Sequence, residues 1–184
     1  MTSVDRLWYL ADEAAQEAEQ LTHRLRDRYD DPVAFDLERH VSRSRFQTIV
    51  DRIRENGLPY GAQVLVRTPA DAVLLVRETH HDQWVLPGGQ VQEGESIREG
   101  ARRELREEAG IDVGFDGLGL LGRVEFYSEG HRTWGVLPVY EAVTERVEPS
   151  IDDPDEEILA ADWFVDPPDD VRDRSILERY LRRR

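Results

Sequence analysis

The sequence of 184 residues contains no cysteine. This absence excludes disulfide bonds, metal sites built from thiolates and catalysis by a cysteine nucleophile. No stretch approaches the roughly 18 consecutive apolar residues that a membrane-spanning helix needs, so we expect no membrane span. Residues 1–25 are charged throughout and have no apolar segment of the kind found in secretory signals. We therefore expect a cytoplasmic protein.

Lysine is also absent, because all 24 basic residues are arginine, and 39 acidic residues bring the net charge to −15. Such a surface repels polyphosphate chains at long range, so nucleic acid is not an expected partner. The composition resembles that of proteins from salt-accumulating archaea, in which concentrated salt screens the self-repulsion. The alternative explanation is a GC-rich genome that favours arginine over lysine. Composition alone favours the halophilic interpretation.

Residues 1–57 are predicted to form a helical hairpin that precedes a second domain. Apolar residues recur in the first part at spacings of three and four, which places them on one stripe of a helix: Leu7, Ala11, Ala14, Ala18, Leu21 and Leu25. A second helix is predicted from Asp36 to Asn56, and Gly57 would end it. Its apolar face would consist of Phe46, Ile49, Val50 and Ile53.

The small alanines of the first stripe indicate close packing against a partner helix. That partner is either the second helix of the same chain or a second copy of the chain, which would make residues 1–57 a dimerisation element. A basic cluster, predicted to lie on the second helix, is more typical of a solvated face than of a nucleic-acid contact in so acidic a protein. Its members are Arg39, His40, Arg43 and Arg45.

Residues 58–184 are predicted to form a single α+β domain, because short β-rich runs alternate with only two helical segments. The runs 62–67 and 72–77 flank a Thr-Pro-Ala-Asp turn and predict a β-hairpin. Further strands are expected at 84–86, 119–127, 133–143 and 161–165, with a final helix at 169–184.

One helix in this domain combines an apolar stripe with glutamates. Ser96 and Glu99 fit a capping box, and Gly110 fits the position after the helix end, which predicts a helix over 97–109. At 100° per residue, Glu104 and Glu108 lie within about 40° of one another on the edge of that stripe. Partly buried carboxylates repel each other unless a cation neutralises them. Oxygen ligands at this spacing suit Mg²⁺ or Mn²⁺.

The same segment resembles the Nudix box, G-x5-E-x7-R-E-U-x-E-E-x-G-U, in which U is aliphatic. Gly89, Glu95, Arg103-Glu104-Leu105, Glu107-Glu108 and Gly110-Ile111 match all nine specified positions. The motif covers 23 residues, and the strand order from about 60 to 165 is similar to that of the family. A chance match anywhere in a chain of this composition would be on the order of one in a million.

The resemblance implies an αβα sandwich with a mixed sheet that hydrolyses a nucleoside diphosphate linked to another moiety, with Mg²⁺ as the metal and Mn²⁺ as an alternative. Glu108 would be the main metal ligand, and Glu104 would be a ligand or the base that activates water. Glu107 would be a further ligand, and so would the carbonyl of Gly88, just before the motif. Arg103 would orient the glutamates through ion pairs, and Glu95 would be structural.

Family members often take one more carboxylate from a loop far downstream. The acidic run Asp152-Asp153-Pro154-Asp155-Glu156-Glu157 occupies the corresponding place. Glu156 and Glu157 are the two candidates for this distal ligand or base, and no spacing rule decides between them.

The motif indicates a reaction class but not the substrate. ADP-ribose, dinucleoside polyphosphates and nucleoside triphosphates all remain candidates. Tyr127 follows the motif where ADP-ribose hydrolases typically have proline, whereas the N-terminal extension resembles one found on some of those enzymes. Aromatic side chains that could stack on a base are also explained as core residues: Trp84, Phe126, Tyr127 and Trp134. A binding module of Nudix fold that does not cleave its ligand is the alternative function.

Overall fold

The computed structural model describes residues 3–183, which cluster into two compact units. Unit one contains the chain up to Tyr60 together with Leu120–Pro138, and unit two contains Gly61–Gly119 and the chain from Val139 onward. This division differs from a boundary at 57/58, because the segment Leu120–Pro138 clusters with the N-terminal residues. Within residues 3–183, no helix is both long enough and apolar enough to cross a membrane.

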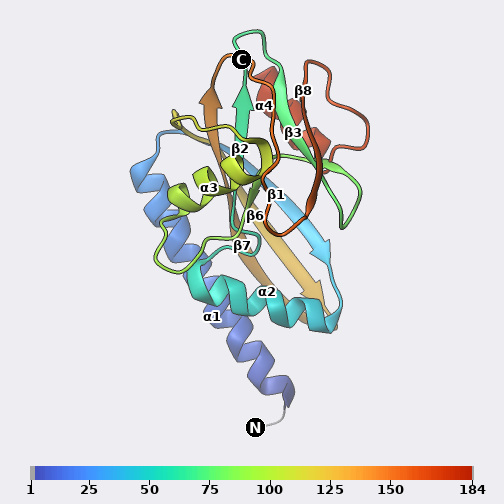
Figure 1. Ribbon diagram of the computed structural model, residues 1–184. Coiled ribbons are helices and arrows are strands. Elements are labelled where there is room, and N and C mark those ends of the chain that lie inside the picture. Colours follow the sequence, from blue (N-terminus) through green and yellow to red (C-terminus); the bar gives the residue numbers. More distant parts are fainter. Residues whose placement is uncertain (1–2, 184) are drawn as a thin grey trace. The chain divides into compact units, whose positions relative to one another are not determined.

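Unit one combines two helices with three strands. Its N-terminal part forms α1 (Ser3–Arg28), β1 (Val33–His40) and α2 (Arg43–Asn56), and it also contains portions of β6 (Gly117–Ser128) and β7 (His131–Val143). Strand β1 runs parallel to β6, with Val33 opposite Leu120 and His40 opposite Tyr127 (Figure 1). Strands β6 and β7 are hydrogen-bonded neighbours.

The predicted apolar stripes of the two helices are confirmed. All six stripe residues of α1 and all four of α2 are buried, and the two helices contact each other within unit one. Gly57 ends α2 in the left-handed conformation (φ 83°). A Cβ atom there would lie only 2.7 Å from Cδ2 of Leu21 on α1. Glycine therefore both ends α2 and lets the chain pass close to α1.

The prediction of a helix from Asp36 is wrong for residues 36–40, which belong to strand β1, so an uninterrupted helical hairpin does not form. Buried or half-buried residues alternate with exposed ones along β1, beginning with buried Val33 and Phe35. This alternation of two residues is the period of a strand. Parallel pairing with β6 supplies the backbone hydrogen bonds that a helix would otherwise provide. As a result, Arg39 and His40 lie on β1, whereas Arg43 and Arg45 lie on α2.

Unit two contains a mixed sheet. Its strands are β2 (Ala62–Arg67), β3 (Val73–Glu78), β4 (Trp84–Val85), β5 (Gly88–Gly89), β8 (Ile158–Phe164) and the end of β7. Strand β2 runs parallel to β7 and antiparallel to β3, and β3 also pairs with β4 and β8. The predicted hairpin of β2 and β3 is confirmed. Helix α4 begins at Arg174 rather than at 169 and ends at Arg182.

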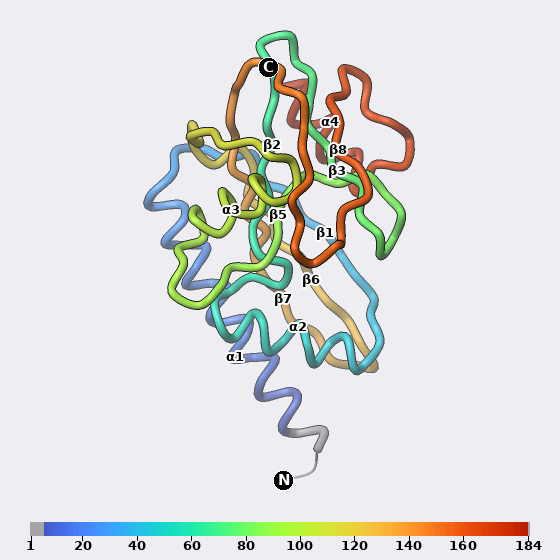
Figure 2. The backbone as a smooth tube through the Cα atoms, viewed as in Figure 1, coloured from blue at the N-terminus to red at the C-terminus, as the bar shows by residue number. Residues whose placement is uncertain are grey.

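Helix α3 (Ile97–Ala109) contacts β2 and β5 in unit two (Figure 2). Its apolar face consists of Ala101, Leu105 and Ala109, all fully buried. Strand β2 contributes Val64, Leu65 and Val66, also fully buried, to the same unit's core. Burial of this stripe fixes which side of α3 faces the sheet, and so fixes where the glutamates beside the stripe point.

Candidate active site

The glycine turn before α3 allows unusually close contact between backbone and side chains. Gly88 and Gly89 form β5 and pair with Gln63 and Ala62 of β2. A Cβ atom on Gly88 would lie 2.6 Å from Cα of Gln63, and one on Gly89 would lie 2.6 Å from Cδ of Glu104. A side chain at position 89 would force the Glu104 carboxylate to move from its place at the turn.

Both ends of α3 form as the sequence predicts. The Ser96 hydroxyl accepts a hydrogen bond from the Glu99 amide (3.2 Å), and the Glu99 carboxylate accepts one from the Ser96 amide (2.8 Å). Gly110 ends the helix in the left-handed conformation (φ 67°). These caps fix the first and last turns, so Arg103, Glu104, Glu107 and Glu108, which lie in the second half of α3, are held on a well-defined helix.

Arg103 connects the acidic side chains of the motif. Its guanidinium donates to both carboxylate oxygens of Glu95 at 2.7 and 3.1 Å, to Glu104 at 2.7 Å and to Glu107 at 3.2 Å. It also donates to the Gln90 carbonyl at 2.9 Å. The pKa of Arg103 is raised, and its hydrogen bonds to Glu95 are the largest cause. The same hydrogen bonds lower the pKa of Glu95. Glu95 therefore anchors Arg103, which in turn orients Glu104 and Glu107.

Glu108 is the most buried carboxylate of the site, with 8% of its surface exposed. Its Oε2 atom accepts a hydrogen bond of 2.9 Å from the Gly88 amide. Burial nevertheless raises the pKa of Glu108 well above its usual range, and the negative charges of Glu104, Asp153 and Glu157 raise it further. Burial also raises the pKa of Glu104, with smaller contributions from Glu107 and Asp153 and an opposing one from Arg103. These shifts record carboxylates that lack enough positive charge nearby.

The downstream acidic loop lies close enough to α3 to affect these carboxylates. Its backbone is bound to the end of the helix: the Ser150 amide donates to the Ala109 carbonyl (2.9 Å) and the Asp152 amide to the Glu107 carbonyl (2.8 Å). Within the loop, Asp153 is half-buried, whereas Glu156 and Glu157 are exposed. From this loop, the charges of Asp153 and Glu157 add to that of Glu104 in raising the pKa of Glu108.

The donor set fits a divalent cation. All of its side-chain donors are carboxylates, which magnesium and manganese prefer, and the one guanidinium among them is already engaged by Glu95. In residues 3–183, no three His, Asp or Glu side chains stand close enough together to hold a metal ion as they are placed. Binding would therefore have to draw the carboxylates inward, and a cation supplies the charge that makes this favourable.

Comparison with known proteins decides the family. A family model described as the NUDIX domain matches residues 57–182. The chain belongs to the Nudix family. Among curated proteins, a candidate 8-oxo-dGTP diphosphatase of Bacillus subtilis (strain 168) is 35% identical over 89 residues, which cover 48% of this chain and 60% of that protein. The chain thus spans less than two thirds of that relative.

Two solved Nudix structures share the fold. The MutT protein of Methanosarcina mazei Go1 matches with a TM-score of 0.51 and 23% identity over 66% of this chain and 91% of its own. The Nudix domain of Shewanella oneidensis NrtR, solved with ADP ribose, matches with a TM-score of 0.50 and 22% identity over 66% of this chain and 84% of its own. Family members generally use divalent metals, in agreement with the donor set found here.

The structure brings together most of the residues singled out from the sequence. Gly88, Arg103, Glu104, Glu107 and Glu108 all meet around the turn and α3. Of the two distal candidates, Glu157 is among the charges that raise the pKa of Glu108.

Sequence reasoning missed Asp153, which acts on both Glu104 and Glu108. An aspartate just before Pro-Asp is typical of a side chain that accepts from its own following backbone, and this signal could have identified it.

Three of the four aromatic candidates for base stacking are explained by contacts within their own units. Phe126 is fully buried in unit one, as the core interpretation requires. Trp84 packs edge-on against Phe164 (4.8 Å between ring centroids) in unit two. In unit one, Trp134 is covered by the guanidinium of Arg123, 3.9 Å from its ring centroid. Burial and ring contacts within each unit thus account for these three side chains.

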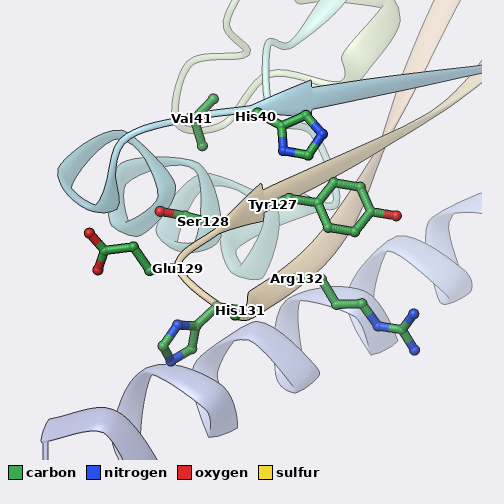
Figure 3. Close-up of a pocket in the computed structure, with 8 residues that line it drawn as sticks. His40, Val41, Tyr127, Ser128, Glu129, His131 and Arg132 are labelled. Atoms are coloured by element: carbon green, nitrogen blue, oxygen red, sulfur yellow. The ribbon is translucent and has the colours of Figure 1, made fainter.

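A cavity of about 580 Å³ lies at the turn between β6 and β7 in unit one. None of the predicted catalytic or metal-binding residues lines it, although Tyr127, one of the aromatic candidates, does. Figure 3 shows the side chains of Tyr127 and Glu129 pointing in opposite directions, so its lining does not converge on one point. Its lining residues are His40, Val41, Tyr127, Ser128, Glu129, Gly130, His131 and Arg132. It is therefore not the candidate active site.

Proposed function

We propose that this chain is a divalent-metal-dependent pyrophosphohydrolase that cleaves a nucleoside diphosphate linked to another moiety. The observation that carries the proposal is the pair of half-buried Glu104 and buried Glu108 beside the glycine turn, with burial raising the pKa of both. Evolved cores avoid uncompensated buried carboxylates because they cost stability, so this arrangement is best explained by a cation that binds there.

The motif residues take the roles that the family resemblance implies. Glu108 is the main metal ligand, and Glu107 and the Gly88 carbonyl are further ligands. Glu104 is either a ligand or the base, and Arg103 sets the orientation of Glu104 and Glu107. A Mg²⁺ or Mn²⁺ ion would supply charge neutralisation of the pyrophosphate and polarisation of the attacking water.

The reaction itself needs one water molecule. Its oxygen forms a bond to one phosphorus of the pyrophosphate, and the bridging P–O bond breaks toward the other phosphate. The proton lost by water passes to a carboxylate whose pKa is raised toward neutrality, which is the property that makes Glu104 a suitable base. The products are a nucleoside monophosphate and a second phosphate compound.

Glu157 is the better candidate for the distal carboxylate. Its charge acts on Glu108. Glu156 has a left-handed backbone (φ 53°) and an exposed side chain, so its main contribution is to the path of the loop. Replacing Glu156 with glycine should leave kcat unchanged, whereas Glu157→Gln should lower it by roughly tenfold or more. Equal loss in both variants would contradict this choice.

Substrates proposed for the chain are ADP-ribose, dinucleoside polyphosphates and nucleoside triphosphates, including oxidised ones such as the 8-oxo-dGTP named for the Bacillus relative. The direct experiment is product analysis over this panel with Mg²⁺ or Mn²⁺. Glu104→Gln should nearly abolish turnover while the protein stays folded. Glu93→Gln, which removes an exposed carboxylate from the turn before α3, should behave like the parent protein.

The outcome separates two functions. Cleavage of one compound to a nucleoside monophosphate establishes the reaction and names the substrate class. Tight binding of a nucleotide by the folded protein without any cleavage would instead indicate a binding module of Nudix fold. Running the panel at low and at molar KCl also tests the proposal of a salt-adapted cytoplasmic protein, which requires higher activity in molar KCl.

A homodimer through residues 1–57 also remains a proposal. The alanine stripe of α1 is buried within unit one and is therefore used inside the chain. Trp8 and Tyr9 lie on α1 with 61% and 57% of their surfaces exposed, so they are the side chains on which a dimer contact would have to rely. Analytical ultracentrifugation of the protein and of a Trp8→Ser/Tyr9→Ser variant would test it, and a monomeric parent protein would refute it.

A further inference from the structure

The carboxylate of Asp153 is used as an internal acceptor for its own loop. Its Oδ1 atom accepts from the Asp155 amide at 3.1 Å, and its Oδ2 atom accepts from the amides of Glu157 at 2.6 Å and Ile158 at 3.0 Å. The Asp153 carbonyl also accepts from the Glu156 amide at 3.2 Å. One side chain therefore fixes the backbone from 155 to 158.

The peptide groups of Glu157 are held on both sides. Its amide donates to Asp153, and its carbonyl accepts a hydrogen bond of 2.8 Å from the Thr79 amide. The start of the loop is bound to the carbonyls of Glu107 and Ala109 at the end of α3. The exposed side chain of Glu157 therefore extends from a backbone that is fixed relative to the helix carrying the motif carboxylates.

From these contacts we propose that Asp153 is a positioning residue, which holds the Glu157 carboxylate at the metal site formed by the glutamates of α3. This inference rests on the proposed pyrophosphohydrolase function. Asp153 does this work through three hydrogen bonds to backbone amides. Its influence on the reaction passes through Glu157, and Asp153 itself does not bind the metal or the substrate.

Hydrogen bonds from backbone amides to a charged carboxylate are stronger than those between neutral groups. An exposed loop that loses its internal acceptor samples several conformations, and the fraction with Glu157 correctly placed falls. If that fraction falls to about one tenth, kcat falls about tenfold in proportion. Because the loop is largely exposed, the melting temperature of the whole protein should stay within about 2 °C.

The test is a double-mutant cycle measured by steady-state kinetics on the substrate found with the parent protein. Asp153→Ala should lower kcat about tenfold, but it should have no further effect, within about twofold, in a Glu157→Gln background. Asp153→Asn can still accept two of the three amide bonds, so it should recover much of the lost activity. Asp155→Asn removes one exposed charge from the same loop without removing an acceptor, and should match the parent protein.

Three results would overturn the proposal. Losses from Asp153→Ala and Glu157→Gln that multiply would mean that Asp153 acts directly on the metal or substrate. Equal losses in Asp155→Asn and Asp153→Ala would mean that only the charge of the loop matters. A parent-like kcat in Asp153→Ala would mean that the bonds do not position Glu157. A parent protein that cleaves no compound refutes the proposed function itself, which is a different result from any of these.

Discussion

Neutralising Glu108 should make the metal-free protein more stable. The Glu108→Gln variant keeps the size of the side chain, and its carbonyl oxygen can still accept the hydrogen bond from the Gly88 amide. What disappears is a negative charge that is 92% buried and faces Glu104, Asp153 and Glu157. Removing such a charge is worth on the order of 1 kcal/mol, or about 2–4 °C in the melting temperature of a chain of this size.

The effect of pH on this difference has a definite sign. Burial raises the pKa of Glu108 in the folded state above the ordinary value of 4.5. Between that value and the folded-state pKa, Glu108 binds a proton more tightly in the folded protein than in the unfolded chain. The stability that protonated Glu108 contributes is therefore lost as pH rises through the folded-state pKa. The advantage of Glu108→Gln should therefore be largest at pH 8 and should shrink on acidification toward pH 5.

The assay is thermal unfolding in EDTA and then in Mg²⁺. At about a hundred times its Kd, a bound ion stabilises the folded parent protein by about 2.7 kcal/mol, and Glu108→Gln should lose most of that gain. Glu107→Gln is the matched control, because Glu107 is more exposed and is paired with Arg103, so its neutralisation should not stabilise the metal-free protein. A Glu108→Gln variant that melts below the parent protein in EDTA would refute the reasoning.

Three further predictions follow from single contacts. Arg103→Lys keeps the charge but loses the forked guanidinium, so kcat should fall at least about tenfold with a lower melting temperature; unchanged kinetics would contradict it. Gly89→Ala would place a Cβ atom 2.6 Å from Cδ of Glu104, so activity should fall about tenfold while circular dichroism stays unchanged. In unit one, Gly122→Ala drives a methyl group into the ring of Phe35. Overpacking should destabilise that variant by about 1–3 kcal/mol in a denaturant titration, with Gly114→Ala, which meets no atom within 4 Å, as the neutral control.

Local signals predicted α3 and its surroundings accurately. The helix begins and ends where Ser96 and Gly110 placed it, because capping and the left-handed turn depend on neighbouring residues alone. The hairpin of β2 and β3 was equally predictable from its turn. The positions of Arg103, Glu104 and Glu108 on one helix then followed from helical geometry.

The pairing of strands that lie far apart in the sequence could not be predicted from local signals. Residues 33–40 form a strand because β6, far along the sequence, offers them a parallel partner. The run from Asp36 to His40 contains residues that a helix tolerates as well, so local preference did not decide it. The pairing of Leu120–Pro138 with the N-terminal residues was missed for the same reason.

Asp153 was missed because its importance lies in backbone amides rather than in side-chain chemistry. In the sequence it is one of several neighbouring acids, and nothing in its residue type distinguishes it from Asp152 or Asp155. Its place before Pro154 is a local signal for backbone acceptance, and the geometry of the loop shows that it accepts the amides of Glu157 and Ile158.

The last glycine of the motif has a second use besides ending α3. A Cβ atom on Gly110 would lie 2.8 Å from the carbonyl oxygen of Ser150, so the acidic loop rests directly on this position. The Ser150 amide then binds the Ala109 carbonyl beside it. A pattern 23 residues long thus carries a docking point for a segment that it does not contain. Any chain in which a larger residue replaced this glycine would have to find another place for its distal carboxylate, even with every glutamate of the helix intact.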